Sequence, residues 1–592
     1  MRHGLLILSL FLSLSSIFSR MLVPGTGCGR AVAEQERLRP APVVSDHEGS
    51  ARTAPAILEE YKVAAEAESA YQRSDWTAAA PLYQKAAELN PGRGEYWYRY
   101  GYASYKLRDF DRASVGFQHA ADLGQNKVWS LYDLSACQAL RGQREAALRT
   151  MAEALALKYP DRRQFAEDDD FASLRANPEF RQLAGLPPKE GISRDERWRY
   201  DLDFALQELK RLHFSLYHSV TPQHLDAEVQ DFRAAIPSMN DQEIVVGFFR
   251  LFASIGDGHT LMFWPTDPRF RFHSLPIQIG DFTEGLFVTA AAPPYKHLLG
   301  GRIVRLGSVS ITEAASRMSE LISHDNSQGV RRYLSQALGY AELLYGCHIT
   351  ENLHNAEIEV EKDGKTLAET LQVLASDEGV AWTGANQQSS QPLPLWLKSK
   401  QTPYWFEFLA QDKTVYLQFN ENTNRKDEPF DAFCARTVDF IDNHPVEKLV
   451  VDLRNNGGGT NLINKFLIWA ILRTPKVNRR GHLFVIVGRN TFSAAMNCAG
   501  DLERWTEAVF AGEPSGSSPN FIGDTSRVIL PYSGLRASIS NLMWQNSVAW
   551  DDRTWIGPQL YYAPTFADWV ANRDPVLDAI LAFRTEDSPF SR

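Results

Sequence analysis

The chain has 592 residues, more than one hydrophobic core normally supports, so its length indicates two to four domains. Its formal net charge is −10, from 62 lysine and arginine residues against 72 aspartate and glutamate residues, which argues against a protein that binds nucleic acid as a whole. The five cysteines are widely spaced without a CxxC pair, so they indicate neither a disulfide framework nor a zinc site. After the first 20 residues no run is long and apolar enough to span a bilayer, so we expect no membrane span in the mature chain.

The amino terminus has the pattern of a secretory signal. A basic start at Arg2 is followed by an apolar stretch at residues 5–18, and small residues suited to cleavage come later. We expect residues 1–33 to be a signal peptide and residues 34–57, rich in Pro, Arg and Glu, to be a disordered tether. The chain is then exported, to a periplasm or out of the cell. Cys28 matches the bacterial lipid-attachment signal poorly, so lipid anchoring is not expected there.

A repeat of 34 residues runs through residues 58–160. Small residues recur at this spacing with aromatic residues between them, as stacked pairs of helices require where two helices touch. The recurring alanines are Ala79, Ala113 and Ala147 in one series and Ala86, Ala120 and Ala154 in a second. The pattern resembles the tetratricopeptide repeat, and we infer about three repeats. Such an array usually presents a concave surface to a protein partner; the alternative is a structural cap on the domain that follows.

The composition changes after residue 190. Residues 190–275 show helical apolar spacing and lead into a glycine-rich GDGHT segment, and residues 276–375 look like a compact module of strands and helices. Residues 376–394 read as a linker or surface loop. In residues 400–585, strands such as TVYLQF and KLVVDL alternate with helical stretches. This alternation predicts a mainly α/β core.

A serine lies between a buried-type strand and a helix in the segment FVIVGRNTFSAAMNCAGDLERW. Residues 484–487 form the apolar strand, residues 488–490 are typical of a turn, and helical composition starts at Ala494, so Ser493 opens the helix. The usual role at this position is an N-cap, in which the hydroxyl accepts a hydrogen bond from a free helical amide. The alternative is a nucleophile on a strand-turn-helix elbow, where the same amides and the helix dipole favour a developing oxyanion.

Two other segments carry residues suited to acyl transfer. In IGDGHT, glycines allow the backbone to expose the imidazole of His259 in a cleft, although a lone histidine is more often structural. In LVVDLRNNGGGTN, a buried-type strand runs into Gly457, Gly458 and Gly459, whose amides can face a ligand; a plain tight turn is the alternative. Together with Ser493, these segments supply a nucleophile, a general base and backbone donors.

Several motifs follow one another in a recognisable order: GDGHT, VVDLRNNGGGTN, NTFSAAMNCAGDL, AGEPSGSSPNFIGD, LPYSGL and NRDPVLDAIL. This order resembles the carboxy-terminal-processing (tail-specific) and tricorn-like serine peptidase family over roughly residues 195–585. The order of the motifs is much more specific than any one of them. The resemblance implies a ClpP/crotonase-like core over residues 400–585 and a PDZ-like substrate-binding module over residues 276–375.

The resemblance also implies roles for individual residues. The family nucleophile corresponds to Ser493. The oxyanion hole is built from backbone amides, which here would belong to Ala494 and Gly458. The substrate class that this implies is a protein or peptide, and no metal or organic cofactor is implied.

The base and its orienting acid depend on the branch of the family. The tail-specific branch uses a lysine, but Ser518 occupies the matching position and no lysine occurs after Lys476. The tricorn-like branch uses a histidine, which corresponds to His259, and a glutamate shortly before the last motif, where this chain has PQLYYAPT and no acid. Glu513 and Asp257 are the candidates for that acid, with Glu513 slightly preferred. Loss of an orienting acid lowers turnover by about 10⁴-fold, so weak activity is compatible with the sequence.

The sequence therefore predicts an exported serine peptidase whose helical repeats, at residues 58–160, recruit protein partners or substrates. Two alternatives remain open. In one, the peptidase fold is a catalytically weak or inactive ligand-binding module, which fits the missing acid. In the other, the chain is chiefly a scaffold and its repeats do the work. Hydrogen-bonding reach between Ser493 and His259 distinguishes the enzyme from the binding module.

Overall fold

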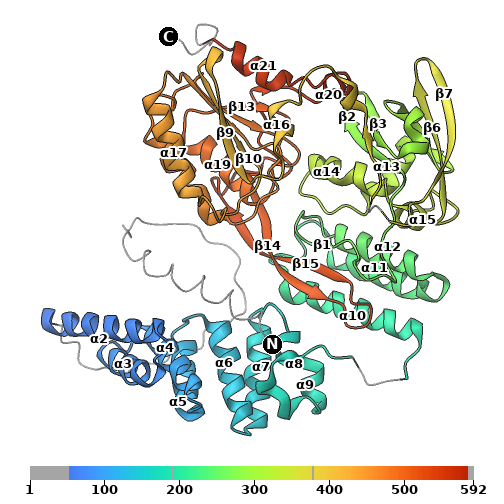
Figure 1. Cartoon of the computed structure of the whole chain (residues 1–592). Coiled ribbons are helices and arrows are strands. Elements are labelled where there is room, and N and C mark those ends of the chain that lie inside the picture. The colour runs from blue at the N-terminus through green and yellow to red at the C-terminus, as the bar shows by residue number, and fades with distance from the viewer. Residues whose placement is uncertain (1–52, 188–190, 377–378, 585–592) are drawn as a thin grey trace.

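The computed structural model describes residues 53–187, 191–376 and 379–584, and it has a helical amino-terminal part followed by mixed α/β parts, as expected at that level (Figure 1). The predicted signal peptide, Cys28 and all but the last residues of the predicted tether lie outside the described residues. Within the described ranges, no helix combines the length and the apolar character needed to cross a bilayer.

Consecutive helices pack against one another through the amino-terminal part of the chain (Figure 1). They are α2 (Ala54–Gln72), α3 (Trp76–Leu89), α4 (Gly94–Lys106), α5 (Phe110–Asp122), α6 (Lys127–Leu140) and α7 (Arg144–Ala156), followed by the shorter α8 (Arg163–Glu167), η1 (Asp169–Leu174) and α9 (Pro178–Leu183). The alanines of both 34-residue series are completely buried, because larger side chains would hold the helices apart. Asp75 and Asp109, also 34 residues apart, accept N-cap hydrogen bonds from the amides of Ala78 and Arg112.

The middle of the chain packs helices and an antiparallel sheet around one hydrophobic core. The helices are α10 (Arg194–Leu212), α11 (Pro222–Ala235), α12 (Asp241–Ala253), α13 (Ile311–Ser319), α14 (Ser327–Ala337) and α15 (Ala341–Gly346). The strands are β2 (Ile277–Phe282), β3 (Gly285–Ala291), β4 (Arg302–Leu306), β6 (Asn355–Lys362) and β7 (Lys365–Gln372), adjacent in that order, with β5 (Val309–Ser310) and β8 (Thr383–Gly384) at its margins. Because α10 and α12 share this core with the sheet, the boundary expected at residue 275 does not separate two cores.

The last part of the chain is a mainly parallel sheet with helices on both faces. Its strands, in spatial order, are β16 (Leu560–Tyr561), β13 (Val509–Gly512), β12 (Leu483–Val487), β11 (Lys448–Asp452), β10 (Thr414–Phe419) and β9 (Tyr404–Leu409), of which β9 is antiparallel to β10. One face packs on α17 (Phe430–Asn443), α18 (Asn464–Leu472) and α19 (Ala494–Trp505), and the other packs on α21 (Pro575–Ala582). Both faces are covered, which explains why the central strands are apolar throughout rather than alternating.

A long antiparallel ribbon runs from this sheet to the helices of the middle part (Figure 1). It consists of β14 (Asn520–Ile529) and β15 (Arg536–Gln545), and the short β1 (Leu261–Met262) pairs with β15. At the tip of the ribbon, the carboxylate of Asp201 in α10 accepts the amides of Tyr532 and Ser533. The pairing of β1 with β15 fixes the position of the GDGHT segment, which immediately precedes β1.

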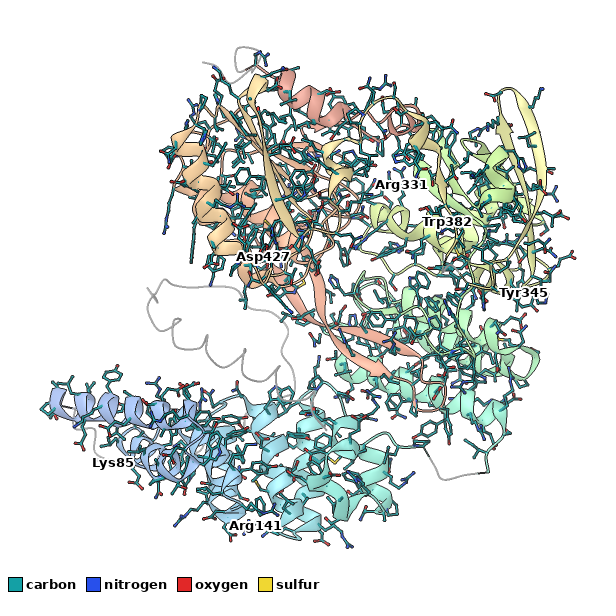
Figure 2. All side chains as sticks on the ribbon, viewed as in Figure 1. Lys85, Arg141, Arg331, Tyr345, Trp382 and Asp427 are labelled. Atoms are coloured by element: carbon teal, nitrogen blue, oxygen red, sulfur yellow. The ribbon has the colours of Figure 1, made fainter. Side chains whose placement is uncertain are left out.

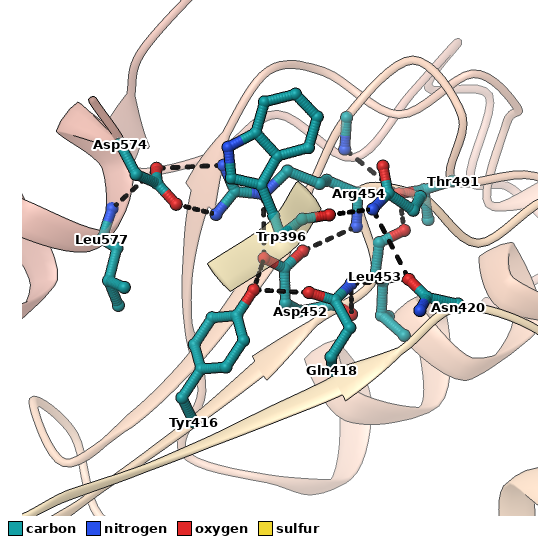
Figure 3. A network of polar contacts seen from close by, with 12 residues as sticks. Trp396, Tyr416, Gln418, Asn420, Asp452, Leu453, Arg454, Thr491, Asp574 and Leu577 are labelled. Atoms are coloured by element: carbon teal, nitrogen blue, oxygen red, sulfur yellow. Dashed lines mark hydrogen bonds and ion pairs between the residues drawn. The ribbon is translucent and has the colours of Figure 1, made fainter. Parts of the chain in front are cut away.

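A buried polar network lies at the carboxyl end of β11, where the glycine-rich loop begins (Figure 3). Arg454 donates to Asp452 Oδ2 at 2.8 Å and to both carboxylate oxygens of Asp574, at 3.0 and 2.9 Å. Asp574 also caps α21, and Tyr416 donates to Asp452 at 2.6 Å. The ion pairs tie the start of the glycine-rich loop to α21. Each carboxylate pairs with the single guanidinium and accepts further hydrogen bonds, from Tyr416 to Asp452 and from the amide of Leu577 to Asp574.

Candidate functional site

Ser493 occupies a sharp turn between β12 and α19, and its backbone has an unusual conformation. Its φ of 55° and ψ of −127° lie in a region that residues other than glycine rarely adopt, at a cost of about 1–3 kcal/mol. The hydroxyl makes no cap hydrogen bond to α19, so the residue opens the helix without serving as a side-chain N-cap. A serine held in a strained strand-to-helix turn has the geometry of a nucleophile elbow.

Thr491 holds this turn in place. Its completely buried hydroxyl donates to the carbonyl of Leu453 at 3.0 Å and accepts the amide of Gly488 at 3.1 Å. The turn is therefore bound both to the end of β12 and to the strand beside it. Strain at one residue persists only where its surroundings determine the backbone in this way.

The glycine-rich loop lies directly against Ser493. A Cβ on Gly458, whose φ is +106°, would fall 2.6 Å from the Cβ of Ser493 and 3.0 Å from the amide nitrogen of Ala494. Ala494 is the first residue of α19, so its amide has no acceptor within the helix. The amide of Gly458 donates to Asn456 Oδ1 at 2.9 Å. Of the two amides expected to form the oxyanion hole, that of Gly458 therefore already donates to a neighbouring side chain.

We expect Gly458→Ala to reduce turnover of a peptide substrate by about 10²–10³-fold, because the new methyl group would displace the elbow and its amides. Gly534→Ala is the matched control: that glycine also has a positive φ, +73°, but its Cβ would meet no atom within 4 Å. Both variants are compared by initial rates and by thermal unfolding. Equal rates in the two variants would show that the contact with Ser493 is irrelevant to activity.

His259 lies in an aromatic sandwich beside the elbow. Its ring stacks on Phe492, the residue before Ser493, with centroids 4.3 Å apart, and on Phe521 at 5.5 Å. Both ring nitrogens are buried without a hydrogen-bond partner among the described residues, so no hydrogen bond joins the imidazole to Ser493. Burial is the main reason that the pKa of His259 falls to about 4; the charge of Asp257 opposes this shift and that of Arg332 adds to it. The imidazole is therefore neutral at neutral pH.

Asp257 shapes the loop of His259 rather than contacting its ring. One carboxylate oxygen accepts the amides of His259 and Thr260, at 3.0 and 2.7 Å, and the other lies 2.8 Å from Nε2 of His213. Burial alone would raise the pKa of Asp257, but hydrogen bonds from His213 and Ser540 lower it to about 2. The carboxylate fixes the backbone that carries the imidazole.

Glu513 belongs to a different cluster of charges. Arg489 donates to its two oxygens at 2.7 and 3.2 Å and also to Asp281 at 2.9 Å. Arg331 of α14, labelled in Figure 2, pairs with Asp281 of β2 at 2.7 Å. The cluster joins the antiparallel sheet to the turn before Ser493. The structure thus does not bring Glu513 to the ring of His259.

Asp325, which no sequence motif indicates, lies beside the GDGHT segment. Its carboxylate accepts hydrogen bonds from the amide of Gly258, at 2.7 Å, and from the hydroxyl of Ser517. Burial raises the pKa of Asp325 to about 6. It comes from the segment before α14, about 66 residues away from His259 along the chain, so no local sequence pattern could have connected the two.

Buried polar atoms without partners gather around the elbow. Besides the two nitrogens of His259, they include Nδ2 of Asn456, both amide atoms of Asn497 and Nη1 of Arg332. Asn497 lies one turn along α19 from Ser493, whose carbonyl accepts its backbone amide. Buried polar groups normally find partners, so such a concentration is typical of a site that binds or transforms a polar ligand.

A cavity of about 390 Å³ opens on the other side of the same turn. Its wall includes residues 488–490 of the turn, residues 280–282 of the antiparallel sheet and Trp396. It lies at the carboxyl end of the parallel strands, where α/β sheets commonly bind their ligands. Ser493 and His259 are not in its wall.

Comparison with known proteins gives similarities of structure only. No protein-family model matches the chain, and no curated protein matches it. Among solved structures, mature CPAF complexed with lactacystin is similar at 11% identity and a TM-score of 0.47, covering 65% of this chain and 98% of that one. The photosystem II D1 C-terminal processing protease is similar at 14% identity and a TM-score of 0.32, covering 64% and 97%. The tricorn protease is similar at 12% identity and a TM-score of 0.32, covering 66% and 36%.

Proposed function

We propose that the chain is a serine peptidase in which Ser493 is the nucleophile and His259 its general base. The observation that carries the proposal is the strained elbow of Ser493 beside a buried imidazole whose nitrogens have no other partner. A neutral imidazole with a free nitrogen can accept the proton that the hydroxyl loses. Hydrogen bonds of this kind often form only when substrate is bound, so the missing bond in the free protein is compatible with the role.

In the proposed reaction, Oγ of Ser493 attacks the peptide carbonyl while His259 takes the hydroxyl proton. The oxyanion is stabilised by the amide of Ala494 and, once Asn456 releases it, by that of Gly458. His259 then protonates the leaving amine, and water hydrolyses the acyl-enzyme. Asp257 acts by holding the backbone of His259, so the proposal needs no acid on the ring. We expect a turnover below that of a complete triad.

Labelling with a fluorophosphonate probe tests the proposal directly, because the probe reacts with an activated serine and needs no knowledge of the substrate. We expect the full chain to be labelled, Ser493→Ala not to be labelled, and His259→Ala to be labelled at least about 10³-fold more slowly. A folded wild-type protein that resists labelling would contradict the proposal, as would labelling that survives in Ser493→Ala.

A second candidate function is ligand binding without hydrolysis. Three observations favour it: no hydrogen bond joins Ser493 to His259 in the described structure, the amide of Gly458 is bound to Asn456, and a cavity of about 390 Å³ adjoins the turn before Ser493. The labelling experiment separates the two candidates, since a binding module leaves the serine unreactive. We also propose that helices α2–α7 contact a protein partner or substrate and that the chain is exported, as its first residues indicate.

A further inference from the structure

Arg332 lies beside the elbow and makes no direct ion pair; the nearby carboxylate of Asp325 acts on its charge only from a distance. Its guanidinium Cζ is 4.8 Å from the ring centroid of Phe492 and 4.8 Å from that of Tyr333. Nη2 lies so close to the glycine-rich loop that a Cβ on Gly457 would fall 2.7 Å from it. Nη1 is buried, and no hydrogen bond or ion pair joins Arg332 to any of the described residues. The cation therefore stands next to the site where a substrate carbonyl would bind.

The other arginines near the elbow all form ion pairs with carboxylates. Arg331, the preceding residue of α14, pairs with Asp281, and Arg489 pairs with both Asp281 and Glu513. Arg454 pairs with two carboxylates as well. Removing a guanidinium from water is costly unless an anion pairs with it directly. Burial lowers the pKa of Arg332, and the nearby Tyr333 and Asp325 oppose this shift only in part. Stacking on the rings of Phe492 and Tyr333 stabilises the cation but leaves the N–H donor at Nη1 without an acceptor.

We propose that Arg332 binds a carboxylate of the substrate, so that the site selects peptides with an acidic group next to the bond that is cleaved. The proposal rests on the proposed peptidase function and names its substrate class. The planar guanidinium suits a carboxylate because it can donate two parallel hydrogen bonds. The acidic group can be an Asp or Glu side chain or the carboxylate at the end of the substrate chain, and these two sources share the same chemistry.

Binding a carboxylate there would also affect the base. The charge of Arg332 contributes to the low pKa of His259. A bound carboxylate compensates that charge and so raises the pKa of the imidazole towards its ordinary value, which makes it a stronger base. An acidic substrate would in this way improve the catalyst as it binds.

Peptide binding to Ser493→Ala tests the proposal without depending on hydrolysis. Three pools of fluorescent peptides with mixed flanking residues are compared: amidated with a central Glu, amidated with a central Gln, and Gln-containing with a free terminal carboxylate. We expect the Glu pool, the free-carboxylate pool or both to bind about tenfold more tightly than the amidated Gln pool. The pool that binds tightly identifies the source of the carboxylate.

The preference for peptides with a carboxylate should disappear when Arg332→Gln is added to Ser493→Ala. It should weaken when Arg332→Lys is added, because lysine keeps the positive charge but cannot donate two parallel hydrogen bonds. Gly457→Ala should weaken it independently, because its methyl group displaces Nη2 while Arg332 itself is unchanged. Arg317→Gln is the control, since the side chain of Arg317 is partly exposed and pairs with Glu313 within α13. Equal binding of all three pools, or a preference that survives in Arg332→Gln, would overturn the proposal. Fluorophosphonate labelling of the wild type reports separately on the peptidase function.

Discussion

Replacing Ser493 with glycine is expected to abolish peptide hydrolysis and, at the same time, to make the protein more stable. Loss of the nucleophile lowers turnover by about 10⁴-fold or more. Glycine adopts a φ of 55° with a ψ of −127° without the steric cost that a side chain incurs. After allowance for the greater freedom of glycine in the unfolded chain, we expect the free energy of unfolding to rise by about 1 kcal/mol.

Ser493→Ala is the matched comparison for this experiment. It also lacks the hydroxyl, so it should be equally inactive, but it retains Cβ and therefore the strain. Urea unfolding followed by tryptophan fluorescence measures the difference between the two variants. If the glycine variant were no more stable than the alanine variant, the turn would not be strained, and the structural argument for an elbow would fail.

The second large effect concerns His259 and pH. Because its pKa in the folded protein is about 4, the imidazole stays unprotonated far below the ordinary histidine value of about 6.5. We expect the rate of labelling by the fluorophosphonate probe to stay constant from pH 7 to about pH 5 and to fall below about pH 4. A fall centred near pH 6.5 would show that the imidazole is solvated and would contradict its buried position.

The same group makes folding stability depend on pH. Between about pH 6.5 and pH 4 the unfolded chain binds a proton at His259 that the folded protein does not bind. The free energy of unfolding therefore falls by about 3 kcal/mol as the pH is lowered through this window. In His259→Leu this dependence should be absent. Asp257 contributes in a lower window, since its pKa of about 2 stabilises the folded state above pH 3.8 and this stability is lost as the pH approaches 2.

The elements around Ser493 could be predicted because their signals are local. The apolar run of β12, the turn after it and the helical composition from Ala494 all lie within about twenty residues. The same holds for the glycine-rich loop, where a positive φ and close contact with Ser493 require glycine at 458. Hydrophobic periodicity and turn residues suffice for such features.

The surroundings of His259 could not be predicted in the same way. Asp325 and Arg332 reach the site from the segment around α14, and Phe521 reaches it from β14, so only tertiary packing brings them together. The position of Glu513 in a motif favours it as the orienting acid, but in the structure Arg489 binds its carboxylate. Which acid pairs with which base depends on side chains that are far apart in the sequence. A single sequence does not show which of them are close in space.

The ribbon of β14 and β15 belongs to both cores at once. Phe521 packs into the core of the parallel sheet, whereas Val528 and Ile539 pack into the core shared by α10 and the antiparallel sheet. Ser493 therefore belongs to the part of the chain built on one core and His259 to the part built on the other, and the ribbon of β14 and β15 connects the two parts. Because the ribbon is part of both cores, a change that shifts one core against the other would move His259 relative to Ser493. The proposed reaction therefore depends on how the two cores pack together as well as on the residues of the site.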